Sequence, residues 1–318
     1  MTDRKINKLL RKEFRPIGWI LVGYYLLMNL MVTLVSCVDL VKQVLWNLIL
    51  GAPALDLDMD VLMNNAWGYI LCIFLGLILL HAWKGTDFWR EEVFRKERKI
   101  TPFVFLCAMC FCMGSQMLNS VWLTTLELIM NLFGSSLMET LESVTGSTDS
   151  FSMFLYGSIL APLWEEVLFR GYILRALRPY GRRFSIFGSA LLFALFHGNL
   201  LQGPYAFLIG LVLGWLACEY SINWSIALHV FNNLVLAEGL GRITEYLPMA
   251  VSDGIYVALF GVSTVASFVI LRRKRNEIRA YRQGEWIDRR CVKCLLTNSG
   301  SIVFLMMMTV SMIIWMTA

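Results

Sequence analysis

Two adjacent glutamates, Glu165 and Glu166, lie inside a run of apolar residues long enough to cross a lipid bilayer, and Arg170 follows four residues later. A carboxylate at membrane depth costs about 3 kcal/mol even on lenient insertion scales, so such residues are functional candidates. The chain has three histidines, and two of them, His197 and His229, occur in the next apolar segments. A site that handles protons, water or a metal ion is therefore expected here.

Helical spacing predicts which of these polar side chains share a helix face. Residues four apart lie on one face of a helix, so Glu166 and Arg170 are expected to form an ion pair. Glu165 is rotated from Glu166 by about 100° and is free to face a cavity. His229 shares a face with Asn233 in the same way. Four polar groups from three spans are therefore expected to converge, namely Glu165, His197, His229 and Asn233.

A glutamate beside a histidine can activate a water molecule, because a desolvated carboxylate is a stronger base than one in water. A second histidine and an asparagine amide can donate hydrogen bonds to a developing oxyanion. The same groups can instead bind a divalent metal such as zinc, with Glu165, His197 and His229 as ligands and one position open for water. The chain has no His-Glu-x-x-His motif. The spacing leaves both alternatives open, with a metal or without one.

The composition indicates an all-α polytopic membrane protein. Of the 318 residues, 58% are hydrophobic and 16% are charged, with a mean hydropathy of +0.62. Soluble domains are about 45–50% apolar and about 25% charged. The basic residues cluster beside apolar runs, so the net charge of +5 indicates contact with membrane lipids rather than with nucleic acid.

Apolar runs of about 17–25 residues predict transmembrane helices. We expect eight to nine of them in one bundle. They lie near residues 17–38, 66–83, 102–121 (with a possible extension to 133), 151–174, 184–200, 205–220, 224–240, 254–271 and 302–317. The shorter run at 44–55 contains a proline and is predicted to be a separate interfacial or re-entrant piece.

The loop charges predict an orientation in the cell membrane. Residues 1–16 carry six basic side chains, and residues 84–99, 175–183 and 272–275 are also basic, whereas 56–60 and 134–150 are acidic. The positive-inside rule then places the N-terminus in the cytoplasm. The first apolar run is longer than the 7–15 residues of a signal peptide, so we expect an uncleaved span. We divide the chain into N-terminal spans (1–150), a core with the polar residues (151–240), and C-terminal spans with a basic loop (241–318).

Three short motifs on successive spans resemble those of a known family of intramembrane proteases. They are Glu165-Glu166-x-x-x-Arg170, Phe193-x-x-x-His197 and His229-x-x-x-Asn233. In this order they are similar to the motifs of the CaaX protease and bacteriocin-processing family (CPBP, or Abi), which is usually labelled as metalloprotease. The resemblance covers about residues 150–240.

The resemblance implies a role for each motif residue. Glu165 and His197 would activate the water, and His229 with Asn233 would stabilise the oxyanion. Glu166, paired with the arginine of its motif, would be structural or assisting. The implied activity is that of a CaaX-type endopeptidase, which acts on a peptide or protein substrate near the cytoplasmic membrane face.

Two other classes of function remain open. A secondary transporter would use Glu165 and the histidines as a proton relay, although the internal repeats typical of transporters are not visible in the sequence. A catalytically silent family member would serve as an immunity protein or a scaffold. Membrane lipids are expected partners in each case.

A few further residues receive structural interpretations. Gly210 and Gly214 form a small-x-x-x-small pair, which predicts close helix packing. Glu219 is expected at a helix end in contact with solvent. Cys291 and Cys294 form a Cys-x-x-Cys pair in a predicted basic loop, and no second pair lies nearby to complete a zinc site.

Overall fold

The computed structural model is all-helical, as predicted from the composition. It describes residues 3–51, 53, 56–134, 136, 150–283 and 287–317, and no strand occurs in these ranges. Most of the predicted acidic loop at 134–150 lies outside the described residues. The long helices are α1 (Asp3–Leu50), α3 (Trp67–Asp87), α4 (Pro102–Leu132), α13 (Met249–Arg273) and α16 (Ser299–Thr317).

Four helical stretches of the described residues are long and apolar enough to cross a membrane, namely Asp3–Leu50, Met59–Val93, Pro102–Leu132 and Met249–Arg273. A fifth is added if α15 (Arg289–Leu296) and α16, which are bent by 67° at their junction, count as one span. These helices support a multi-pass membrane protein. They do not confirm the predicted count of eight to nine spans.

The predicted spans between residues 184 and 240 are helical but short. They form α9 (Arg182–Phe196), α10 (Gly203–Glu219) and α11 (Ile222–Val230), and α11 continues as the π-helical segment η5 (Phe231–Gly239). The possible extension of the third span is confirmed, because α4 runs to Leu132.

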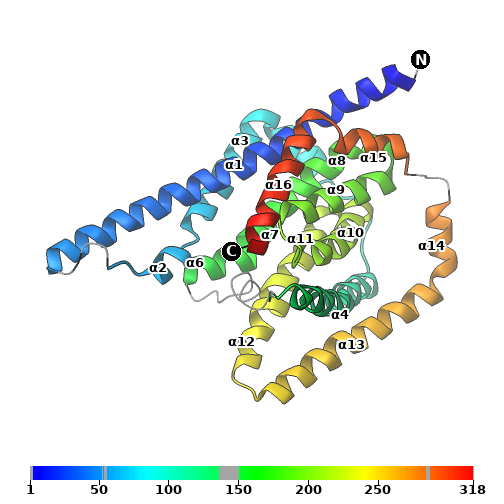
Figure 1. The fold of residues 1–318 in the computed structure, drawn as a ribbon. Helices are drawn as coiled ribbons and strands as arrows, with labels where there is room; N and C mark the ends of the chain where they lie inside the picture. The colour runs from blue at the N-terminus through cyan, green and yellow to red at the C-terminus, as the bar shows by residue number, and fades with distance from the viewer. Residues whose placement is uncertain are drawn as a thin grey trace.

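The helix α1 corrects the prediction for residues 44–55. Residues 44–50 are not a separate piece but continue α1, which ends at Leu50, three residues before Pro53. The 48 residues of α1 correspond to about 72 Å at 1.5 Å per residue, more than twice the hydrocarbon thickness of a bilayer. Figure 1 shows α1 extending beyond the rest of the bundle at both ends.

The helix that carries the two glutamates runs through the centre of the bundle. Its consecutive segments are α6 (Phe151–Leu155), η2 (Tyr156–Leu160), α7 (Ala161–Glu166), η3 (Val167–Ile173) and α8 (Leu174–Leu177). In Figure 1, this helix and α9–α11 lie between α1, α3 and α16 on one side and the pair α4 and α13 on the other. The wide π-helical turns η2 and η3 flank α7, and such turns are frequent at functional sites.

A buried glutamate, Glu219, connects three segments that are distant in the sequence. Glu219, which we expected in contact with solvent, is only 5% exposed. It accepts hydrogen bonds from Arg182 Nη1 at 3.1 Å and the Tyr281 hydroxyl at 2.9 Å, and it also pairs with Arg98. The prediction of a solvated side chain was wrong, because these partners come from distant parts of the chain.

The two cysteines of the Cys-x-x-Cys pair also differ from the prediction. Cys291 and Cys294 lie on α15 rather than in a loop, and both are buried. Cys294 Sγ lies 3.7 Å from the backbone oxygen of Asn7 in α1. Cys294 thus packs α15 against the start of α1.

The helix α16 begins at a side-chain cap and then packs closely against α1. Asn298 Oδ1 accepts the backbone N–H of Ser301 at 3.0 Å, which caps the first turn of α16. At the crossing, a Cβ atom on Gly18 would overlap with the backbone of Gly300 and Ser301. A Cβ on Gly300 would lie 2.6 Å from the backbone nitrogen of Trp19. Only glycines permit this approach of the two backbones.

We therefore expect Gly18→Ala to separate α1 from α16 and to lower the free energy of unfolding by about 1–3 kcal/mol. Thermal unfolding in detergent measures the effect. Gly23→Ala is the matched control on the same helix, because nothing lies within 4 Å of a Cβ added there. The control should be neutral or stabilising by up to about 1 kcal/mol. Equal midpoints for the two variants would contradict the close crossing.

Candidate active site

Glu166 is completely buried, and both of its oxygens are hydrogen-bonded. Oε1 accepts from Arg170 Nη1 at 2.7 Å and lies 2.9 Å from His229 Nδ1, and Oε2 accepts from the Ser225 hydroxyl. The expected ion pair with Arg170 is thus present. Ser225 was missed, although it lies four residues before His229 and helical spacing could have identified it. These partners hold the Glu166 carboxylate in a fixed position.

Arg170 is equally buried and is enclosed by α9 and α10. Its Nη2 donates to the backbone oxygen of Gly210 at 3.4 Å, and its guanidinium lies 4.4 Å from the centre of the Phe193 ring. A Cβ on Gly210 would lie 3.1 Å from the Cβ of Ala190 and 3.3 Å from Arg170 Nη2. The small residue thus allows α10 to approach both α9 and the arginine, which confirms the predicted packing role.

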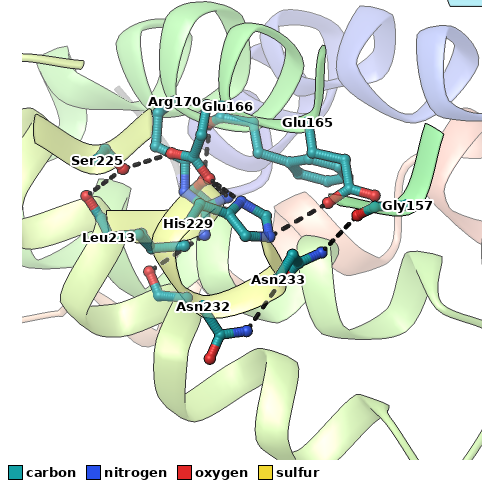
Figure 2. Close-up of polar contacts among 12 residues, drawn as sticks. Gly157, Glu165, Glu166, Arg170, Leu213, Ser225, His229, Asn232 and Asn233 are labelled. Atoms are coloured by element: carbon teal, nitrogen blue, oxygen red, sulfur yellow. Dashed lines mark hydrogen bonds and ion pairs between the residues drawn. The ribbon is translucent and has the colours of Figure 1, made fainter. Parts of the chain in front are cut away.

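His229 bridges the two glutamates, a contact that the sequence did not predict. Its Nδ1 faces Glu166, and its Nε2 lies 3.6 Å from Glu165 Oε2 (Figure 2). An ionised carboxylate only accepts hydrogen bonds, so Nδ1 carries a hydrogen. The ring of His229 therefore lies between the two carboxylates, with Nδ1 toward Glu166 and Nε2 toward Glu165.

Glu165 is the accessible member of the pair. Its side chain is 23% exposed, whereas that of Glu166 is 0% exposed. It lines a pocket together with Tyr24 from α1, Tyr156 from η2 and its own neighbour Trp164. Of the described residues around this pocket, Glu165 alone is charged. The Glu165 carboxylate thus faces an apolar, largely aromatic space.

His197 lies at the C-terminal end of α9 with one ring nitrogen occupied. Its Nδ1 is 2.9 Å from the backbone oxygen of Phe193, which can only accept, so Nδ1 carries the hydrogen. In the neutral ring Nε2 then has a free lone pair. The Phe193 ring is in edge contact with His197 at 4.9 Å and with His229 at 5.7 Å between centroids.

Asn233 is held by a chain of hydrogen bonds that begins outside the three motifs. Its Nδ2 donates to the Gly157 oxygen at 3.0 Å, and its Oδ1 accepts from Asn232 Nδ2 at 3.0 Å (Figure 2). Asn232 in turn accepts from the Tyr205 hydroxyl at 2.5 Å. One N–H of Asn233 remains for another acceptor. The sequence did not identify Asn232 or Tyr205 as site residues. The only pattern that could have indicated Asn232 is its position next to Asn233.

Within the part of the chain that the structure describes, no three His, Cys, Asp or Glu side chains are arranged to hold a metal ion. The hydrogen bond from His197 Nδ1 to a backbone oxygen leaves Nε2 open, which is the arrangement usual in both a metal-binding and a metal-free histidine. The alternative with Glu165, His197 and His229 as zinc ligands stays a prediction.

These features define a polytopic helical membrane protein in which a glutamate pair, two histidines and an asparagine gather on adjacent helices. Residues 147–235 match the model of a family described as type II CAAX prenyl endopeptidase Rce1-like. The resemblance to the CPBP family is thereby confirmed for a segment that includes all seven motif residues named above. The match covers less than a third of the chain. It supports a membrane protease at the level of the family.

Comparison with the curated proteins and with the solved structures found no match.

Arg170→Met should lower the free energy of unfolding by about 3–5 kcal/mol, because Glu166 would be left buried without its cation. The double variant Glu166→Gln with Arg170→Met removes both charges and should recover part of this loss. Chemical denaturation in detergent measures both.

The matched control for this prediction is a surface ion pair. Lys274 Nζ lies 2.7 Å from Glu277 Oε1 with both side chains exposed, so Lys274→Ala should change stability by less than about 1 kcal/mol. A similar small effect for Arg170→Met would show that Glu166 does not depend on its cation.

Proposed function

We propose that this protein is an intramembrane endopeptidase of the CAAX prenyl endopeptidase type. It hydrolyses a peptide bond near the cytoplasmic face of the cell membrane, with its N-terminus in the cytoplasm. The observation that supports this most directly is the difference between the adjacent glutamates: Glu166 has both oxygens hydrogen-bonded, and Glu165 faces a pocket. The family match of residues 147–235 supports the same reaction class.

In the proposed first step, Glu165 accepts a proton from a water molecule beside its carboxylate. The free Nε2 lone pair of His197 accepts a hydrogen bond from the same water and helps to hold it. The oxygen of the water then adds to the carbonyl carbon of the scissile peptide bond, and the carbonyl oxygen becomes negative. General-base assistance of this kind contributes about 10²–10⁴-fold to rate.

In the second step, the negative oxygen is stabilised by donors on the neighbouring helix. Protonated His229 donates from Nε2, and Asn233 donates its remaining N–H. When the intermediate collapses, the carbon–nitrogen bond breaks and the leaving nitrogen takes the proton held by Glu165. The products are a carboxylic acid and an amine, and Glu165 returns to its ionised form. His229 stays anchored to Glu166 throughout.

The substrate class follows from the family and from the surroundings of Glu165. The matched family acts on prenylated CAAX proteins by its description. The pocket is apolar, and part of its lining comes from two helices that are long enough to cross a membrane. We therefore propose a peptide or protein substrate that reaches the site from the membrane, with residues 151–240 as the catalytic core.

Glu165→Gln should lower the cleavage rate by about 10²–10⁴-fold, because glutamine has a similar shape but cannot accept the proton. A fluorogenic farnesylated CAAX peptide, incubated with the full chain in liposomes, measures cleavage. The same peptide without the farnesyl group tests whether the lipid is required. Glu277→Gln, on the exposed end of the surface ion pair, is the matched control and should cleave at the wild-type rate.

The same preparation separates the two other classes of function. Cleavage by Glu165→Gln at the wild-type rate would reject the proposed base. Proton uptake into the liposomes that depends on Glu165, without cleavage of either peptide, would indicate a transporter. If neither peptide is cleaved and no proton uptake occurs, the result would favour a silent scaffold.

A further inference from the structure

The adjacent residues Asn232 and Asn233 are hydrogen-bonded to each other through their side chains. Asn232 Nδ2 donates to Asn233 Oδ1 at 3.0 Å (Figure 2). Adjacent side chains on an α-helix do not normally face each other, but these two lie in the π-helical segment η5, and such turns are frequent at functional sites. Asn232 is only 7% exposed, so protein groups satisfy its amide. A buried residue inside the third motif is thus bonded directly to the proposed oxyanion donor.

The side-chain amide of Asn233 has two ends with opposite effects on an oxyanion. The NH₂ end donates hydrogen bonds and stabilises negative charge, whereas the oxygen end only accepts and repels it. The Gly157 oxygen, which can only accept, lies 3.0 Å from Asn233 Nδ2. Asn232 Nδ2, which can only donate, lies 3.0 Å from Asn233 Oδ1. Both contacts therefore require the same orientation of the Asn233 amide, in which Nδ2 keeps one N–H for the oxyanion.

The amide of Asn232 is itself oriented by two donors. Its Oδ1 accepts from the Tyr205 hydroxyl at 2.5 Å and from the Cys112 thiol, whose sulfur lies at 3.3 Å. Tyr205 belongs to α10 and Cys112 to α4. A turned Asn232 amide would present N–H groups to these donors and lose both bonds, so its NH₂ end stays toward Asn233. A chain of hydrogen bonds thus connects α4 and α10 with the Asn233 amide.

We propose that Asn232 positions Asn233 as the oxyanion donor, and that Tyr205 in turn orients Asn232. Neither Asn232 nor Tyr205 contacts the reacting atoms, and no proton moves to or from them. Their role is to keep the donor end of one amide in the direction in which negative charge develops. This inference rests on the proposed function and adds to it two positioning residues that are not among the residues that define the three motifs.

The effect on the reaction is expected in the transition state. The substrate carbonyl oxygen becomes negative only as water adds, so a donor aimed at that oxygen lowers the barrier more than it strengthens substrate binding. Donors that are already oriented need no reorganisation at the moment of reaction. A turned or loosely held Asn233 amide should therefore reduce kcat and leave KM almost unchanged.

The test uses two variants of the full chain in liposomes, with the farnesylated peptide as probe. Asn232→Asp keeps the shape, but an ionised carboxylate only accepts and therefore attracts the NH₂ end of Asn233. It should lower kcat by about 100-fold, the loss typical of one oxyanion donor. Tyr205→Phe removes one of the two donors to Asn232 and should lower kcat by about fivefold. In both variants KM should stay within about twofold of wild type.

A second measurement separates positioning from a general disturbance of the fold. A farnesylated peptide in which a phosphinate replaces the scissile peptide bond has a tetrahedral, negatively charged centre and resembles the proposed intermediate. In each variant its inhibition constant should rise by about the factor by which kcat/KM falls. Thermal unfolding in detergent reports whether each variant is folded.

Tyr256→Phe is the matched control for the loss of a tyrosine hydroxyl. The Tyr256 hydroxyl also has a side-chain partner, since it lies 2.9 Å from the Thr244 hydroxyl, and Tyr256 belongs to α13, outside the chain of hydrogen bonds that ends at Asn233. Its kcat and its inhibition by the phosphinate should equal those of the wild type.

The possible outcomes distinguish this inference from the proposed function. If the wild type cleaves and Glu165→Gln does not, the proposed function holds, and the Asn232 and Tyr205 variants decide the present point. A folded Asn232→Asp variant with wild-type kcat would overturn the positioning role. If that variant does not fold, an unchanged kcat in Tyr205→Phe would overturn it. A rise in KM as large as the loss of phosphinate affinity would also overturn it, because substrate binding as a whole would then be disturbed. A wild type that cleaves no peptide would reject the proposed function itself.

Discussion

The buried ion pair between Glu166 and Arg170 is the interaction on which the site depends. Two charges in an apolar interior are stabilised by hydrogen bonds beyond those of the pair itself. Ser225 and His229 from α11 bond to the glutamate, and the Gly210 carbonyl from α10 accepts from Arg170 Nη2, whereas Arg170 Nε has no partner among the described residues. The pair therefore fixes the helix that carries it against two other helices. The orientation of the His229 ring is a consequence of this requirement.

The adjacent residues Glu165 and Glu166 differ in exposure because successive side chains on a helix point in different directions. Glu166 faces the packed interface with α10 and α11, and Glu165, one position earlier, faces the pocket beside α1 and α3. His229 contacts both carboxylates through its two nitrogens. The buried and the accessible carboxylates are thus connected by a single ring, so a change in one alters the electrostatic environment of the other.

The features that the sequence predicted are those that depend on local spacing. The Glu166–Arg170 pair is a contact within one helix, and the close packing at Gly210 follows from residue size. The prediction that Glu219 contacts solvent was wrong because its partners lie 121, 37 and 62 residues away in the sequence. No local pattern indicates that these residues meet. The bridge from His229 to two glutamates and the support of Asn233 by Asn232 are likewise products of the fold. Residues 44–50 were predicted to form a separate piece because their apolar run is too short to span a membrane alone. They are instead the last turns of α1, and an extension of an existing helix does not have to span the membrane by itself.

The pocket beside Glu165 cannot be formed by the matched segment alone. Residues 147–235 supply Glu165, Trp164 and Tyr156, but Tyr24 and Met28 come from α1, and Ile73 comes from α3. The position of α1 depends on its glycine crossing with α16, which lies at the other end of the chain. A shift of that crossing would move Tyr24 and, through ring contact, the indole of Trp164. The chemistry proposed for the motifs is thus common to the family segment, whereas the shape of the space in which it occurs is set by helices that the family match does not cover.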